Sequence, residues 1–152
     1  MRTTIIAFLL LVSASVHADC IMEMNGDWLL NPAKSLDEGG PDWETLAFSN
    51  TESEQRYTME YLMEDGEKGR LDWAVPCDGD VHPSPPAPWD DAPGRTIRLT
   101  RLGEKTELVT HMTDGETTNP YTRVLIDDDN TLISIGRLPD GTIEWVRVFD
   151  RQ

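Results

Sequence analysis

Cysteine and histidine are scarce in this 152-residue chain, which has two cysteines and three histidines. Transition-metal sites need several cysteine, histidine or carboxylate ligands at close spacing. Beyond residue 18 only His82 and His111 remain, far apart in sequence, and no phosphate-binding glycine loop or nucleophile elbow occurs. We therefore expect no resident metal, no cofactor and no enzymatic activity.

Long apolar runs are also missing. The longest covers residues 5–12, which is too short to cross a bilayer. Because a basic residue precedes it and small residues follow it, we expect residues 1–18 to be a signal peptide, cleaved after Ala18, and the product to be periplasmic or secreted. A lipid anchor on Cys20 is an alternative, but the acidic Asp19 fits a lipoprotein cleavage site poorly.

Basic residues are few. Thirteen lysines and arginines face 28 acidic residues, which gives a formal net charge of −15. Such a surface repels nucleic acid and anionic lipid headgroups. It would attract a basic protein partner, although an acidic surface also simply keeps an exported protein soluble.

The two cysteines are expected to form one disulfide. Residues 19–152 have the length of a single domain, and Cys20 and Cys77 both lie in it. If the chain is exported, its compartment is oxidising. We expect the Cys20–Cys77 bond to fasten the N-terminus to the domain.

Period-two alternation of apolar residues dominates the chain and predicts β-strands. The strand-length runs are separated by short segments such as "DGEKG", "TDGET", "DDDN" and "PDG", which are typical of turns. About eight or nine strands with hairpin-length links predict an all-β fold, an up-and-down antiparallel barrel. The expected strands are 26–30, 43–49, 56–64, 70–76, 95–102, 105–112, 119–126, 131–138 and 142–149.

A proline-rich segment, residues 82–94, holds half of the ten prolines and cannot be a central strand. It is predicted to be a stiff, extended excursion with Trp89 at its tip. The simplest interpretation is a rigid surface connector. The functional alternative is a lid or docking loop whose tryptophan contacts a ligand or a partner.

The N-terminal string resembles a known family. Gly26-x-Trp28 on the first strand of a β-meander is similar to the first-strand signature of lipocalins. The fuller string "GDWLLNPAKS", with a later Pro-x-Asp-Gly-x-x-His-Pro segment at residues 76–83, resembles small bacterial lipocalin-like secreted proteins. The resemblance implies a barrel whose closed end is plugged by Trp28 and covered by an arginine of the last strand. Arg147 and Arg151 are both candidates, and Arg147 is expected because the strand continues beyond it.

Arginines alternate with large apolar residues on three of the expected strands. Arg101, Arg123 and Arg147 each share a face with such residues, so they point to the same side as the apolar core. In the lumen, one or two of them could hold the carboxylate of an apolar acid. Alternatively, they reach toward a rim and pair with glutamate or aspartate. The candidate ligand-binding residues are Trp73, Arg101, Met112, Arg123, Trp145, Arg147 and Phe149.

Clusters of carboxylates offer little chemistry. Asp78, Asp80 and His82 share one loop and Asp127–Asp129 another, but neither has the glycine and distal glutamate of a calcium loop. We expect His111 to be a hydrogen-bonded strand histidine rather than a general base. The sequence therefore predicts non-catalytic binding of a small apolar or amphipathic molecule in the barrel. The alternative is an acidic interaction or inhibitor module that docks on a basic exported protein through the proline-rich segment.

Overall fold

The computed structural model describes residues 19–38, 40–62, 66–85 and 93–152. The predicted signal peptide, residues 1–18, lies outside the described residues, and so does Trp89. No helix within the described ranges is long and apolar enough to cross a membrane.

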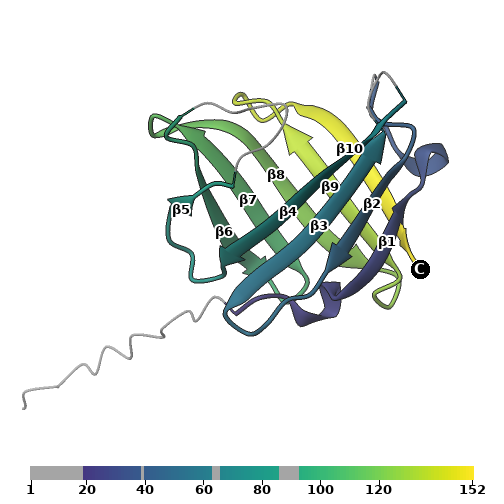
Figure 1. Cartoon of the computed structure of the whole chain (residues 1–152), viewed down its shortest axis with the longest axis horizontal. Helices are drawn as coiled ribbons and strands as arrows, with labels where there is room; N and C mark the ends of the chain where they lie inside the picture. Colours follow the sequence, from purple (N-terminus) through teal and green to yellow (C-terminus); the bar gives the residue numbers. More distant parts are fainter. Residues whose placement is uncertain (1–18, 39, 63–65, 86–92) are drawn as a thin grey trace, which may run out of the picture.

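The strands form a single ten-stranded antiparallel sheet that curls into a barrel (Figure 1). Strands adjacent in sequence from β1 to β4 and from β5 to β10 are neighbours, and β1 also pairs with β10. This confirms the predicted all-β, up-and-down class, with more strands than the eight or nine expected. The strands are β1 (Gly26–Leu30), β2 (Glu44–Phe48), β3 (Glu54–Leu62), β4 (Lys68–Pro76), β5 (His82–Pro83), β6 (Thr96–Gly103), β7 (Thr106–Thr113), β8 (Glu116–Ile126), β9 (Thr131–Arg137) and β10 (Ile143–Arg151).

The additional strand, β5, comes from the start of the proline-rich segment. It pairs only with β6, where His82 lies opposite Ile97. Proline is tolerated in β5 because this strand is at the edge of the sheet. Strands β4 and β6 lie side by side but share no hydrogen-bond ladder, so the barrel is nearly closed.

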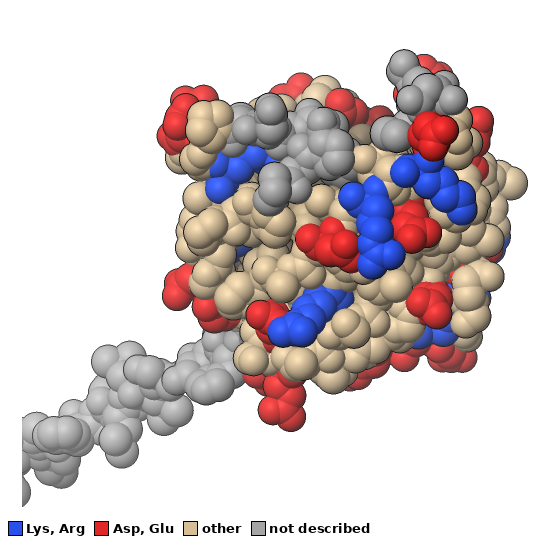
Figure 2. All heavy atoms as spheres, viewed as in Figure 1, with Lys and Arg blue, Asp and Glu red and all other residues tan. Residues whose placement is uncertain are grey.

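Tight turns and alternating side chains explain why these segments form strands. The link between β7 and β8 has positive φ angles at Asp114 (52°) and Gly115 (82°), as a two-residue hairpin turn requires. In β4, Leu71, Trp73 and Val75 are buried while the residues between them are exposed. One face of each strand therefore lines the interior and the other meets solvent. On the face that Figure 2 presents, acidic side chains lie beside most of the basic ones. Exposed ion pairs of this kind include those of Arg70 with Glu60 and Asp72.

Trp28, to which the lipocalin resemblance assigns the plug, lies at one end of the barrel interior. Its ring is fully buried, and its indole Nε1 donates to the backbone oxygen of Met24 at 2.9 Å. Met24 ends a short 3₁₀ helix, η1 (Met22–Met24), and is itself fully buried. This end of the barrel is filled by side chains.

The arginine that covers Trp28 is Arg151, and the assignment to Arg147 is wrong. The Arg151 guanidinium lies 4.2 Å from the centroid of the Trp28 ring. Strand register explains why Arg151 covers Trp28, because Arg151 is the residue directly opposite Trp28 in the β1–β10 pair. Arg147 lies four residues earlier, roughly 13 Å along the strand. The same guanidinium explains Gly26, where a Cβ atom would lie 2.8 Å from Arg151 Nη1.

The chain after β1 continues beside β10, along the edge of that strand with which β1 pairs. A second 3₁₀ helix, η2 (Pro32–Lys34), starts at the proline that ends the first strand. Beyond it, Leu36 exchanges two backbone hydrogen bonds with Val146, at 2.8 and 2.7 Å. This packing explains why Val148 is buried although Phe149, its neighbour, occupies the inner face.

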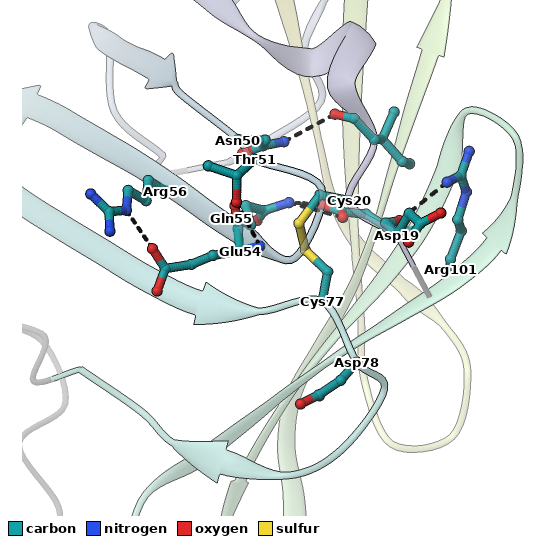
Figure 3. Close-up of a disulfide and its surroundings, with 12 residues drawn as sticks. Asp19, Cys20, Asn50, Thr51, Glu54, Gln55, Arg56, Cys77, Asp78 and Arg101 are labelled. Atoms are coloured by element: carbon teal, nitrogen blue, oxygen red, sulfur yellow. Dashed lines mark hydrogen bonds and ion pairs between the residues drawn. A yellow bond between two sulfur atoms is a disulfide. The ribbon is translucent and has the colours of Figure 1, made fainter. Parts of the chain in front are cut away.

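Cys20 and Cys77 form the predicted disulfide, with Cα atoms 5.3 Å apart (Figure 3). The bond joins the segment before β1 to the end of β4. Backbone hydrogen bonds support both ends, from Cys20 to Glu52 and from Cys77 to Ser53. Because the Cys20 sulfur is in this bond, it is not free for the lipid anchor considered above.

Candidate ligand-binding cavity

A cavity of about 930 Å³ lies inside the barrel, on the side away from the Trp28 plug. Residues at the start of β2, at the end of β3 and in the link between β3 and β4 form part of its wall, including Glu44, Tyr61, Leu62 and Gly66. Its volume is within the range that small-molecule sites occupy. The barrel thus combines a filled end with a hollow one.

Five of the seven predicted ligand-binding residues line this cavity: Trp73, Arg123, Trp145, Arg147 and Phe149. The prediction that Arg101 belongs to the ligand-binding residues is wrong. Its guanidinium donates to the backbone oxygens of Gly103, Glu104 and Asp19, at the far end of β6 from the cavity (Figure 3). Arg101 therefore fastens a turn and the N-terminal segment.

The same prediction for Met112 is also wrong. It is half-buried and does not line the cavity, whereas its neighbour His111 is buried and does. In the regular part of the β6–β7 pair, His111 lies opposite the buried Ile97 and Met112 lies opposite Thr96, so the two side chains lie on opposite faces of this pair. The histidine expected to have a purely structural role is thus part of the cavity wall.

Six rings follow one another around the barrel, and we name this set the aromatic belt. Consecutive ring centroids are 5.2, 5.0, 5.0, 5.9 and 5.9 Å apart. The rings come from six different strands, and the contact between Trp73 and His111 crosses from β4 to β7, past the unpaired edge of β4. All of them except Phe48 line the cavity. In order they are Phe48, Tyr57, Trp73, His111, Tyr121 and Trp145.

A glycine makes room for the last ring of the belt. Gly136 lies opposite Trp145 in the β9–β10 pair, and a Cβ atom there would lie 2.1 Å from the Trp145 ring. Gly69, opposite Tyr61 in the β3–β4 pair, has the same relationship to the Tyr61 ring, at 2.3 Å. Each ring therefore lies across the backbone of a neighbouring strand.

Arg123 is at the centre of a buried polar network. Its Nη1 donates to Glu107 Oε1 at 3.0 Å and to Gln55 Oε1 at 2.8 Å, and its Nη2 donates to the Tyr121 hydroxyl at 2.7 Å. Gln55 in turn donates to both carboxylate oxygens of Glu107. The Arg123 and Glu107 side chains are 3% and 4% exposed, so this ion pair is inside the protein.

The surroundings raise the pKa of Arg123 in this network and that of Tyr57, whose ring lies 4.8 Å from the Arg123 guanidinium. Burial by itself would lower the pKa of Arg123, but Tyr121 and the Glu107 carboxylate outweigh it and raise that pKa above its ordinary value. Burial raises the pKa of Tyr57 well above its ordinary value. Near neutral pH, Arg123 is therefore charged and Tyr57 is protonated.

Arg147 carries a second set of ion pairs. Its Nε donates to Asp37 Oδ2 at 2.6 Å and its Nη1 to Glu44 Oε2 at 2.9 Å, while its guanidinium lies 4.9 Å from the centroid of Trp145. Burial raises the pKa of Glu44, although Arg147 opposes the shift. Arg123 and Arg147 both pair with acidic residues, as in the alternative considered above, but Arg123 does so inside the barrel and does not reach a rim.

No group of three or more metal-ligating side chains comes together in the described parts of the chain. Asp78 and His82 form a pair, with Oδ1 and Nε2 2.8 Å apart, and the hydrogen bond lowers the pKa of Asp78. Asp127, Asp128 and Asp129 form a turn in which all three have positive φ angles. The carboxylates of Asp78 and Asp127 support their loops, because they accept hydrogen bonds from the Asp80 backbone N–H and from the Thr131 hydroxyl.

The fold is shared with a solved fatty acid binding protein. The Schistosoma mansoni fatty acid binding protein, solved in complex with arachidonic acid, matches with a TM-score of 0.63, over 87% of this chain and 98% of that chain. The sequences are 14% identical, so the similarity concerns the fold alone. No protein-family model and no curated protein sequence matches this chain.

Proposed function

We propose that this chain is an exported, lipocalin-like protein that binds a small apolar or amphipathic molecule in its barrel without catalysis. The observation that carries the proposal is the cavity of about 930 Å³ inside a barrel that is filled at one end. Its wall combines aromatic rings with several polar and charged side chains, among them Glu44, Arg95, Arg123 and Arg147. Small-molecule sites are likewise concave and lined by aromatic side chains and placed polar groups.

The fold neighbour supports the same interpretation. That protein was solved in complex with arachidonic acid, an apolar chain with one carboxylate. In the present chain we assign ligand contact to Trp73, Arg123, Trp145, Arg147 and Phe149. Both arginines already have carboxylate partners, so apolar contact with the rings supplies most of the proposed affinity.

Export is part of the proposal. The sequence pattern of residues 1–18, with cleavage after Ala18, would deliver the chain to a periplasmic or extracellular compartment. The Cys20–Cys77 disulfide supports this, because such bonds persist in oxidising compartments.

The alternative function, docking on a basic exported protein, remains a prediction. Its proposed contact, Trp89, lies outside the described residues. Its signature would be a steep loss of affinity with added salt, because screening weakens long-range attraction. Binding of an uncharged apolar molecule in the barrel should respond little to salt.

Native mass spectrometry tests the binding proposal. The protein is purified gently from its export compartment and weighed under native and denaturing conditions. A discrete excess mass in the native spectrum only is expected, and its value would indicate the chemistry of the cargo. An identical mass in both spectra, together with no binding of apolar probes, would refute the proposal.

A further inference from the structure

The outer face of strands β6 to β10 carries aliphatic and threonine side chains, although the chain has 28 acidic residues. On β9 and β10, Ser134 and Trp145 line the cavity, so the residues that alternate with them point outward. Strand register joins these outward residues to those of the neighbouring strands in two rows. One row is Thr100, Leu108, Thr122, Ile135, Val146 and Leu36, and the other is Thr106, Val124, Ile133 and Val148. Neither of these rows of described residues contains a charged side chain.

The outer face of β3 and β4 has the opposite character. Arg56 and Arg70 form exposed ion pairs there with acidic side chains. A polar outer face of this kind is usual for an antiparallel sheet whose other face covers a core.

The contrast marks the outside of β6 to β10 as an interaction surface, because contiguous apolar patches on the outside of a domain are typical of binding sites. Leu36, at the border of the patch, is 74% exposed. We name this surface the aliphatic face. Its members are Leu36, Leu108, Val124, Ile133, Ile135 and Val146.

Charges of opposite sign lie at the two ends of β9, the central strand of the aliphatic face. Arg137 ends this strand, and its exposed guanidinium donates to the backbone oxygen of Gly141 at 3.0 Å. The turn before the strand carries the exposed Asp127 and Asp128. Arg137 and Asp128 form no ion pair within the described parts of the chain. They cannot pair with each other in one copy, because seven residues of strand, roughly 20 Å, lie between the turn and the far end of β9.

A two-fold axis in the plane of the face and perpendicular to β9 brings these charges together. Such an axis reverses the strand direction, so that Arg137 of each copy lies beside the aspartate turn of the other copy. An axis parallel to β9 would instead bring the two Arg137 side chains together. Two sheets packed face to face keep their strands within about 30° of each other, so β9 would lie along β9. The face is therefore complementary to itself, as contact between two identical copies requires. A basic protein would find no carboxylate in either row.

We propose that the aliphatic face is a dimer interface, on which a second copy of this chain docks by two-fold symmetry with Arg137 of each copy beside Asp128 of the other. The hollow ends of the two barrels then point in opposite directions, and both cavities stay accessible. This inference does not depend on the proposed function, because the face lies on the outside of the barrel.

Sedimentation equilibrium of the purified protein tests the inference, and we expect a reversible dimer for the wild type. Ile135→Glu places a carboxylate at the centre of the aliphatic face and should raise the dimer dissociation constant about 100-fold or more, because dimerisation would bury two unpaired charges. The matched control is Ala74→Glu. It adds the same charge at an exposed position of β4, opposite Arg56, and should leave the dissociation constant unchanged.

A second pair of variants changes only exposed arginines, so the test stands even if Ile135→Glu fails to fold. Arg137→Asp should raise the dissociation constant about tenfold, because each dimer loses two ion pairs. Arg56→Asp changes the net charge equally on the outer face of β3 and should have a much smaller effect.

Three results would overturn the inference. The first is a wild type that stays monomeric up to about 300 µM, far above the micromolar range of ordinary protein–protein affinities. The second is a dimer that Ile135→Glu does not weaken or that the two arginine substitutions weaken equally. The third is a monomer that floats with phosphatidylcholine vesicles and loses this binding in Ile135→Glu, because the aliphatic face would then contact a membrane.

Discussion

The guanidinium of Arg151 and the ring of Trp28 form a stacked pair across the β1–β10 ladder, 4.2 Å apart. Arg151 also donates to the backbone oxygens of Asn25, Glu23 and Asp129, each at 2.6 Å. One side chain therefore covers the plug and fastens two loops over it.

Replacing Arg151 with alanine should lower the free energy of unfolding by about 2–4 kcal/mol, because it removes both the stacking and three charge-assisted hydrogen bonds. Urea unfolding measures the change. The matched control is Arg56→Ala, which removes an exposed arginine paired with Glu54 and should cost below about 1 kcal/mol. Equal effects of the two substitutions would contradict the structural role of Arg151.

Arg123→Met should lower the free energy of unfolding by about 3–5 kcal/mol, because it leaves the Glu107 carboxylate buried and unpaired. The double variant Arg123→Met, Glu107→Leu should recover much of that loss, since no buried charge remains. Chemical denaturation of the two variants and the wild type measures both steps. A double variant less stable than Arg123→Met would argue against the network as described.

Reduction of the disulfide should destabilise the protein. Cys20 and Cys77 are 57 residues apart in sequence, and for a loop of this length the chain-entropy model gives about 4 kcal/mol. The melting temperature should fall by several degrees in reductant. The control is the double variant Cys20→Ser, Cys77→Ser, whose melting temperature reductant should leave unchanged. No shift in the wild type would mean that the bond contributes little.

Glu44 should make stability depend on pH. Burial raises its pKa in the folded state above the ordinary value of 4.5, so the folded state binds its proton more tightly than the unfolded state. The favourable contribution is complete below pH 4.5 and is lost as the pH rises through the folded-state pKa. Compared with Glu44→Gln, the wild type should therefore lose stability as the pH rises from 4 toward neutrality. A relative gain over that range would mean that Arg147 dominates instead.

Gly136→Ala should lower the free energy of unfolding by about 1–3 kcal/mol, because the added methyl group overlaps the Trp145 ring. Gly103→Ala is the control, since the nearest atom to its added Cβ is 3.9 Å away. Its stability should change by less than about 1 kcal/mol. The two variants are compared by urea unfolding, and Gly136→Ala should also alter the near-ultraviolet circular dichroism of the tryptophans. Equal stability would mean that Trp145 moves freely.

Strand positions could be predicted from the sequence because alternation and turn residues are local. Register could not, and the polar network shows why. Counting outward from the turn at Asp114 and Gly115 places Glu107 opposite Thr122. A register shift between His111 and Met112 moves it opposite Arg123, which creates the buried ion pair. One irregularity in the ladder, with no clear signal in the sequence, thus decides which charges meet.

The aromatic belt shows the same division between local and long-range information. Alternation in the sequence places Tyr57, Trp73 and Trp145 on faces with other large apolar residues. Their contact with His111 depends on which strands become neighbours around the barrel. The wrong prediction of Arg147 as the arginine over Trp28 has the same cause. Arg151 can be identified only from the pairing between the first and last strands, which is long-range information.

No hydrogen-bond ladder joins β4 to β6, so the barrel is one continuous sheet that is open between these two strands. Every other neighbouring pair of strands is joined by backbone hydrogen bonds, including the first and last main strands, β1 and β10. A circular permutation that joins the natural ends and opens the chain between β4 and β5 would therefore break no ladder. In this architecture the order of the strands around the barrel is fixed by the sheet, and the position of the chain ends is free to change.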